Sequence, residues 1–132
     1  LMSEIKIFGK GEKPQAWFDF DEDTEVLIEY TEKEDLEEIR SISLRQAKLA
    51  RSENVDSIAN VLLGKRKVKG WRKKDDHNHP GLIVNGEPFP FSEKNVSFLM
   101  QKSLDFSAFV NDTCLKLKLF SEAEREKEIK NS

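Results

Sequence analysis

Charge is divided along this chain of 132 residues far more sharply than its net charge of −3 indicates. Residues 1–40 hold 13 acids and 5 bases, a balance of −8, whereas residues 41–74 hold 10 bases and 2 acids, a balance of +8. Residues 75–132 hold 10 acids and 7 bases. Oppositely charged segments pair within one folded chain or meet the complementary surface of a second copy, and either contact weakens as salt rises. The division therefore predicts internal pairing or self-association, and we expect a homo-oligomer.

The length of the chain fits one domain, and its composition fits one modest core. Hydrophobic residues make up 37% of the chain and charged residues 36%. No apolar run approaches the roughly 18 residues of a membrane span, and the first residues lack the pattern of a signal peptide. We therefore expect a protein of the cytoplasm with no membrane contact. The single cysteine, Cys114, excludes an intrachain disulfide and a cysteine cluster for zinc.

The first third of the chain predicts an extended arm, a hairpin and a helix. Residues 1–15 show little apolar periodicity, which is typical of a flexible arm. The segments 16–20 and 26–30 are rich in aromatic and β-branched residues, so we expect two strands joined by an acidic turn. Thr31 and Glu34 have the spacing of a capping box at the start of a helix over 32–52.

The rest of the chain predicts three further helices and a second hairpin. A helix is expected over 55–64, where Gly64 ends or weakens it. Asn85-Gly86 favours a tight turn in a hairpin over 82–91. Ser92 is a candidate cap for a helix over 93–102, and the last helix is expected over 105–127.

These elements together predict an α+β fold that is mainly helical, with a small N-terminal β-hairpin and a short central hairpin. We expect a single domain over 16–127, preceded by the arm and followed by a frayed tail at 128–132.

Chemistry-bearing motifs are sparse, so we expect no enzyme, no cofactor and no metal site. The polar segment 75–80 contains two aspartates and two histidines, but their spacing matches no closed metal site. Cys114 has no histidine near it in sequence to form a nucleophile pair. Gly9 and Gly11 neither follow a clear strand nor open a helix, so they form no phosphate-binding loop.

A basic run at 65–74 places seven positive charges around one tryptophan, and phosphate backbones attract such clusters. Four residues of the run would carry nucleic-acid binding: Lys67, Lys69, Arg72 and Lys73. The acidic overall charge and the single aromatic residue count against this function, and the acidic N-terminal residues can neutralise the run. Nucleic-acid binding is therefore kept as the alternative, and we do not expect a nucleic-acid partner.

Apolar side chains offer a second kind of site, for a protein partner. Two sets are candidates, one on helix faces and one around the proline-flanked phenylalanines: Leu36, Ile39, Val96 and Met100, and Trp71, Phe89 and Phe91. For each of them the competing interpretation is packing in the core, since large apolar side chains are most often buried. The sequence does not separate the two interpretations.

The second half of the chain resembles the small tail assembly chaperones of long-tailed bacteriophages. The likeness covers residues 65–132 and rests on the order of several short motifs: Val68, Gly70 and Trp71, then Asn85-Gly86, then Pro90-Phe91-Ser92, a helix pair, and Lys130-Asn131-Ser132. The acidic strand-and-helix region at 17–50 adds weaker support. This chain differs from the family in its basic run and in the histidine-containing segment before Gly81.

The resemblance implies a non-catalytic protein of a phage or prophage, made in the cytoplasm of the bacterial host and absent from the mature virion. Such a protein binds the tape measure protein, keeps it soluble and helps recruit tail-tube subunits. A chaperone of a long helical protein needs exposed apolar grooves and a charged exterior. A structural tail component is a further alternative, which the presence of the protein in purified virions would favour.

Overall fold

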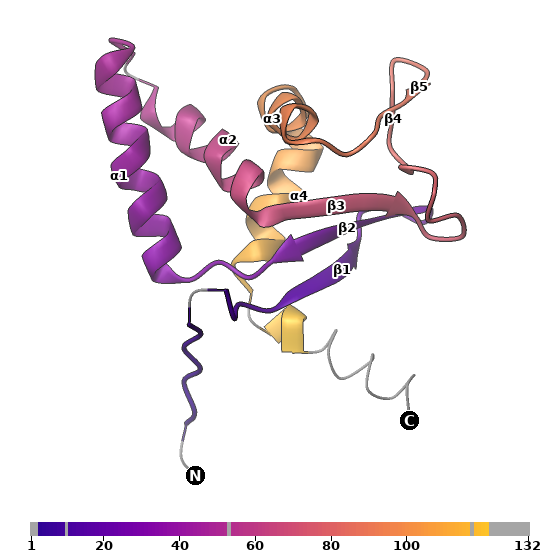
Figure 1. Ribbon diagram of the computed structural model, residues 1–132, viewed down its shortest axis with the longest axis horizontal. Coiled ribbons are helices and arrows are strands. Elements are labelled where there is room, and N and C mark those ends of the chain that lie inside the picture. Colours follow the sequence, from indigo (N-terminus) through magenta and orange to yellow (C-terminus); the bar gives the residue numbers. More distant parts are fainter. Residues whose placement is uncertain (1–2, 10, 53, 117, 122–132) are drawn as a thin grey trace.

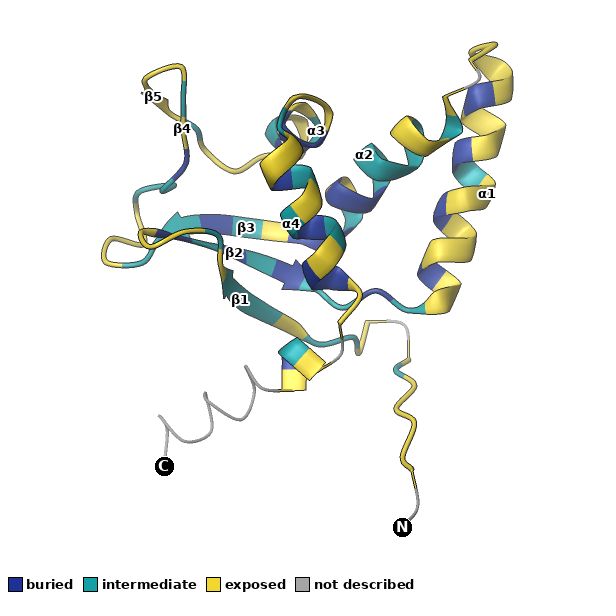
Figure 2. Cartoon of the chain, turned by 180° about the vertical axis from the view of Figure 1, so that it is seen from behind, coloured by how far each residue is buried: buried dark blue, intermediate teal, exposed yellow. Residues whose placement is uncertain are grey.

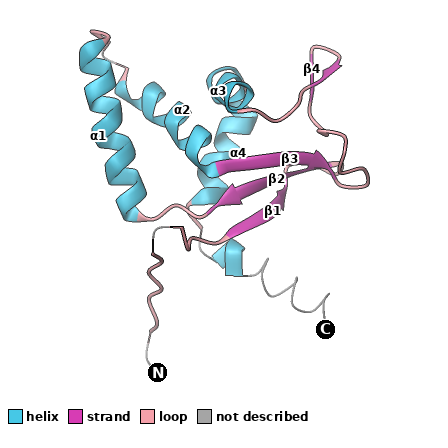
Figure 3. Ribbon diagram, in the orientation of Figure 1, coloured by secondary structure: helices cyan, strands magenta, loops and turns pink. Residues whose placement is uncertain are grey.

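The computed structural model describes residues 3–9, 11–52, 54–116 and 118–121, which form helices around a small antiparallel sheet. The sheet has three strands in the order β1-β2-β3: β1 (Gln15–Asp19), β2 (Thr24–Glu29) and β3 (Val68–Lys73) (Figure 1). The main helices are α1 (Lys33–Leu49), α2 (Val55–Lys67), α3 (Glu93–Lys102) and α4 (Leu104–Cys114) (Figure 3). The predicted α+β class is confirmed.

The N-terminal hairpin forms where the aromatic and β-branched segments predict it. Trp17 pairs with Leu27, and Ala16 pairs with Ile28. Because side chains alternate across a strand, Val26 and Ile28 point to the helix-covered face, where both are completely buried. This face supplies the sheet side of the core, while the opposite face carries the charged side chains of the hairpin.

The basic run forms the third strand, which the sequence did not predict. Helix α2 continues three residues beyond Gly64, and the chain passes directly into β3. A register shift opposite Leu27 and Ile28 breaks the alternation of side chains, so Val68 and Trp71 both point into the core. The irregular spacing and the many lysines and arginines hid this strand.

Gly64 does not end α2, because it is the point at which α3 approaches this helix. The residue is buried, and a Cβ built there would lie 2.3 Å from Cγ of Met100 and 2.7 Å from its Sδ. Met100 is itself buried and has little room to move. A glycine that costs helix stability elsewhere therefore allows close packing of α2 against α3 here.

Helix α1 starts one residue later than the predicted capping box. Its N-cap is Glu32, and the backbone N–H of Glu32 donates to Oδ2 of Asp35 at 2.9 Å. The prediction of Thr31 as the cap is wrong, because Thr31 is buried and its backbone N–H donates to the Cys114 carbonyl at 2.8 Å. The capping box keeps the predicted spacing of three residues but joins Glu32 to Asp35.

The central hairpin and α3 agree with their predictions. Strands β4 (Ile83–Val84) and β5 (Glu87–Pro88) flank Asn85 and Gly86, whose φ angles of 51° and 83° are the positive values that a tight hairpin turn requires. The Ser92 side chain accepts the backbone N–H of Asn95 at 3.0 Å and caps α3. Local sequence therefore determines both elements.

The last predicted helix is interrupted. Helix α4 ends at Cys114, and a separate helical turn follows at 118–121. The change of direction places the buried Phe120 against Phe18, with ring centroids 4.9 Å apart, and against Tyr30, 5.6 Å away. Burial of Phe120 under the hairpin replaces continuation of the helix. The remainder of the predicted helix, 122–127, and the predicted tail, 128–132, lie outside the described residues.

Buried residues lie on the inner sides of the helices and on the sheet, whereas the outer side of α1 and most of the central hairpin are exposed (Figure 2). The core contains Val110, Phe106 and Cys114 from α4 and Val96 from α3. No helix in the described part of the chain has the length and hydropathy needed to cross a bilayer.

Candidate functional site

Every basic side chain of the run at 65–74 lies within 4 Å of a carboxylate. In six of the seven pairs below, the carboxylate comes from another strand or helix; only Asp75 belongs to the run's own flank. The pairs are Lys65–Glu93, Arg66–Glu38, Lys67–Glu29, Lys69–Glu29, Arg72–Glu25, Lys73–Asp75 and Lys74–Asp19. The acidic and basic segments of the sequence therefore pair within one chain.

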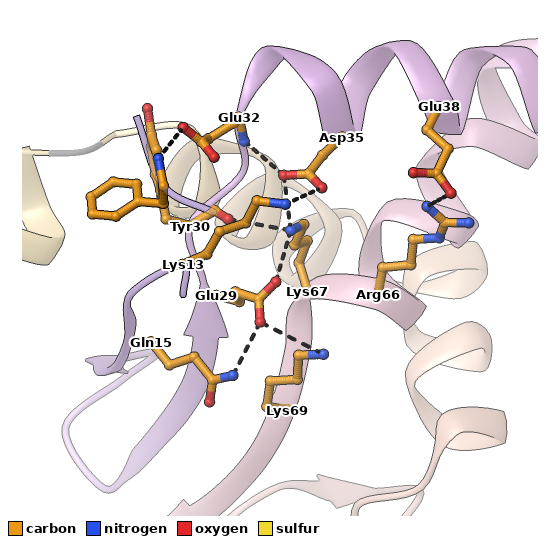
Figure 4. Close-up of polar contacts among 11 residues, drawn as sticks. Lys13, Gln15, Glu29, Tyr30, Glu32, Asp35, Glu38, Arg66, Lys67 and Lys69 are labelled. Carbon is orange, nitrogen blue, oxygen red and sulfur yellow. Dashed lines mark hydrogen bonds and ion pairs between the residues drawn. The ribbon is translucent and has the colours of Figure 1, made fainter. Parts of the chain in front are cut away.

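Lys67 is the centre of this pairing and is almost completely buried, with 2% of its surface exposed. Its Nζ donates to Oε1 of Glu29 at 2.9 Å and to the Tyr30 carbonyl at 3.2 Å, and it lies 3.1 Å from Oδ2 of Asp35 (Figure 4). Lys13 lies 2.8 Å from the other oxygen of Asp35. Two lysines and two carboxylates thus tie the residues before β1, the end of β2, the start of α1 and the end of α2 together.

Asp35 stays ionised in this cluster despite its burial. Burial alone raises the pKa of a carboxyl group, but hydrogen bonds from Lys13, the Glu32 backbone and Lys67 outweigh that effect and hold the pKa of Asp35 below its ordinary value of 3.8. The hydrogen bond with Asp35 likewise raises the pKa of Lys13. Both shifts favour the charged forms of Asp35 and Lys13.

This pKa shift predicts a loss of stability in acid. A group whose folded pKa is lowered stabilises the fold above its unfolded pKa, and that contribution disappears as pH falls below 3.8 and through the lower folded value. We expect the free energy of unfolding in urea to fall more steeply between pH 5 and about pH 2 for the natural chain than for Asp35→Asn. The exposed Asp105→Asn is the matched control, and an equal slope in all three chains would contradict the prediction.

The four residues of the nucleic-acid alternative do not form an open cationic patch. Lys67 is buried, which corrects its assignment as an accessible contact. Arg72 donates from Nε to Glu25 at 2.6 Å and stacks over the Trp17 ring, 3.8 Å from its centroid. Lys69 and Lys73 keep partly exposed side chains but face Glu29 and Asp75. A phosphate backbone would have to displace carboxylates to reach these cations.

The candidate residues for a protein partner divide between core and surface. Ile39, Val96, Met100 and Trp71 are buried, so this chain presents none of them as an accessible contact. Of the candidates predicted on helix faces, only Leu36 of α1 is exposed, so the prediction that the other three contact a partner is wrong. Phe91 is also exposed, and Phe89 is half-buried.

Trp71 is the inner anchor of an aromatic cluster that reaches the surface. Its Nε1 donates to the Phe89 carbonyl at 2.7 Å, and its ring lies parallel to that of Phe89. Phe91 meets the edge of Trp71 at 5.2 Å, and Phe89 contacts Phe98 of α3 at 5.8 Å. The cluster thus connects β3 to the segment before α3 and ends at the exposed ring of Phe98.

An open groove of about 350 Å³ adjoins this cluster between the central hairpin and helices α3 and α4. Its apolar lining comes from Phe20, Leu82, Ile83, Val84, Phe98, Leu99 and Phe106. Ile83 is 55% exposed and Phe98 is 41% exposed. We call this feature the hairpin groove. Exposed apolar side chains therefore line a concave surface here, with the aromatic cluster beside it.

Sequence reasoning missed Phe98 and Ile83. The signal for Phe98 was present, because it lies off the face of α3 that carries the buried Val96, Leu99 and Met100. A large apolar side chain outside the buried face of a helix indicates a contact beyond the core. Ile83 carries no such signal, since alternation in a strand of two residues does not distinguish its faces.

A smaller hollow of about 220 Å³ lies between α1 and α2 and includes Leu36. Its floor contains Asn60, which donates to Ser107 Oγ at 2.8 Å and accepts from Asn111 at 2.7 Å. These amides satisfy one another, so the hollow presents no unpaired polar group from them to a ligand. The hydrogen bonds of Asn60 join α2 to α4.

The polar segment 75–80 and Cys114 show no arrangement for catalysis. No group of three histidine, cysteine, aspartate or glutamate side chains in the described residues could hold a metal ion. Nδ1 of His79 accepts the Gly81 N–H at 2.9 Å and so closes the loop. Cys114 is completely buried, and burial raises the pKa of its thiol, so its reactive thiolate form is disfavoured.

Comparisons with protein-family models, curated proteins and solved structures give no match for this chain.

Proposed function

We propose that this protein is a tail assembly chaperone of a long-tailed bacteriophage that binds the tape measure protein through the hairpin groove. The observation that carries the proposal is the groove itself, with Phe98 and Ile83 exposed at its rim. The order of motifs at 65–132 supports the choice of family, and the groove is a surface suited to binding such a partner.

The groove suits an amphipathic helix, which binds by placing apolar side chains at helical spacing into a hollow lined with aromatic residues. Lys102 lines the groove, and Lys94 lies on the other side of Phe98. Among the described residues no carboxylate lies within salt-bridge distance of either lysine. We therefore propose that the bound helix carries acidic residues beside its apolar face.

The internal pairing of charge supports the same function. Because the basic run faces carboxylates of its own chain, the exterior is charged but has no strong cationic patch there to attract nucleic acid. The proposed protein works in the cytoplasm of the bacterial host, helps recruit tail-tube subunits, forms a homo-oligomer and is absent from the mature virion.

Loss of the groove is expected to abolish capture of the tape measure protein. In co-expression with the tape measure protein encoded nearby, we expect the natural chain to keep that protein soluble and to co-purify with it. The double variant Ile83→Ser and Phe98→Ser removes two partly exposed apolar side chains from the rim of the groove. The affinity for the tape measure protein falls about tenfold for each 1.4 kcal/mol of binding free energy that is lost. Affinity capture followed by quantification of bound tape measure protein measures the effect.

Leu49→Ser is the matched control, since Leu49 is an exposed leucine at the far end of α1. Leu36→Ser tests the competing surface on α1. Full capture by the groove variant, or equal loss in the Leu49 control, would contradict the proposal. Loss only in Leu36→Ser would transfer the binding face to α1. Salt-sensitive binding of DNA, lost on replacing Lys69 and Lys73, would favour the nucleic-acid alternative.

A further inference from the structure

Residues 3–8 form an extended segment that is exposed from residue 3 to residue 7 and is held at Phe8 by other described residues of its own chain. Ile5 is 84% exposed and Ile7 is 85% exposed, and alternate residues of an extended chain share one face. Residues 3–7 make no hydrogen bond, ion pair or ring contact with the described residues. In Figures 1 and 2 the segment leaves the body of the molecule. Two large β-branched side chains on one face indicate a strand without a partner. We call residues 3–8 the arm strand.

The base of the arm strand is fixed, and it directs the strand away from its own sheet. The Phe8 N–H donates to Oε2 of Glu32 at 3.2 Å, and the Phe8 ring meets the edge of Tyr30 at 6.0 Å. A turn follows, in which Glu12 N–H donates to the Gly9 carbonyl at 2.9 Å and Gly11 takes a φ of 85°. Lys13 then binds Asp35. The arm strand therefore starts from a defined anchor and does not fold back on β1.

Strand β1 supplies a matching unpaired edge. The Pro14 carbonyl accepts the Tyr30 N–H, and the Phe20 N–H donates to the Thr24 carbonyl. The even-numbered residues along β1 therefore direct their backbone N–H and C=O groups toward β2. In an antiparallel pair the intervening residues direct their N–H and C=O groups to the other side. Gln15, Trp17 and Asp19 are these residues, and among the described residues no backbone group bonds to them from outside the sheet. An open edge of this kind is a template for another strand.

We propose that the arm strand of one copy adds to the β1 edge of a second copy, and that the exchange is reciprocal. Every copy brings both the unpaired strand and the unpaired edge, so the contact is complementary to itself and closes as a dimer with two such contacts. With Ile5 and Ile7 on the helix-covered face, the added strand would cover the half-buried Phe18 and Phe20. Main-chain hydrogen bonds supply the affinity, as in other cases of strand addition.

The test combines mass with residue-specific amide exchange in the full chain. Light scattering across a concentration series should show the mass rising from 15.3 kDa toward twice that value. At the highest concentration, amide exchange measured by NMR should be at least about tenfold slower at Gln15, Trp17 and Asp19 than in the double variant Ile5→Lys and Ile7→Lys, which should remain a monomer. Exchange at Ala16 and Phe18, whose amides already face β2, should be similar in both. Leu49→Lys, an equally exposed site on α1, should dimerise like the natural chain.

Three results would overturn the proposal. A monomer at all concentrations excludes association through this edge. A dimer that survives in the arm variant, with the β1 amides still protected, means that two β1 edges pair directly. Protected β1 amides in a monomer mean that the arm strand covers its own sheet. None of these outcomes bears on capture of the tape measure protein, which the groove variants test separately.

Discussion

Replacing Lys67 by methionine is expected to lower the free energy of unfolding by about 3 kcal/mol, because it removes the buried cation from between two carboxylates, each of which then keeps one other lysine within 4 Å. The lysine is 2% exposed and lies between Glu29 and Asp35. Removal of one member of a buried ion pair costs much more than the net worth of the pair, since the remaining charge keeps its desolvation penalty. With a typical dependence on urea of about 1.5 kcal/mol per molar, the midpoint of unfolding should fall by about 2 M.

Lys73→Met is the matched control from the same basic run. Its partner, Asp75, is largely exposed, and such pairs contribute less than about 1 kcal/mol. Adding Glu29→Gln to Lys67→Met should restore part of the lost stability, because it removes one of the two carboxylates that have lost the ion pair with Lys67. Equal losses in the two lysine variants would mean that Lys67 is solvated like the other residues of the run.

Replacing Trp71 by alanine is expected to cost about 4 kcal/mol, which makes it a core substitution and not a change at a binding surface. The indole packs against Phe89, Phe91 and Phe106, and its N–H holds the Phe89 carbonyl. The loss of the ring leaves a cavity, and the loss of the hydrogen bond leaves an unsatisfied carbonyl oxygen. Chemical unfolding followed by circular dichroism measures the change.

Trp17→Ala is the comparison for this variant, because Trp17 is only half-buried on the outer face of the sheet beneath Arg72. We expect it to cost about 1 kcal/mol. Trp71→Phe should fall between the two, since it keeps most of the apolar volume but loses the hydrogen bond. A stable Trp71→Ala chain would show that the indole is not part of the core.

Elements controlled by short local signals could be predicted from the sequence. Ser92 caps α3 three residues before Asn95, and Asn85-Gly86 supplies the positive φ angles of the hairpin. Both signals act within a few residues, so neighbouring sequence is sufficient. The pattern of the N-terminal hairpin is equally local.

Elements controlled by contacts between distant segments could not be predicted. Strand β3 forms where seven cations would normally indicate an exposed segment, because carboxylates from β1, β2 and α1 neutralise most of them. Charge composition suggested that the segments pair but could not identify the pairs. Similarly, helical spacing through Phe120 predicted one long helix, whereas packing of Phe120 on Phe18 and Tyr30 requires a break.

The candidate site shows the same division. Phe91 and Leu36 are exposed as a binding role requires, but Ile39, Val96, Met100 and Trp71 are core residues. Apolar identity alone does not tell a buried side chain from an accessible one. The hairpin groove arises from three elements that meet only in the folded chain, so no single segment of sequence could reveal it.

Hydrogen–deuterium exchange of the chain alone and in complex with the tape measure protein tests the proposed binding face most directly. We predict slower exchange in the central hairpin at 82–89 and in α3 around Phe98, with little change in α1. Binding should cover the groove rim, where Ile83 and Phe98 are now exposed. Protection confined to α1 or to the basic strand β3, with the hairpin unchanged, would contradict the claim that the groove holds the partner.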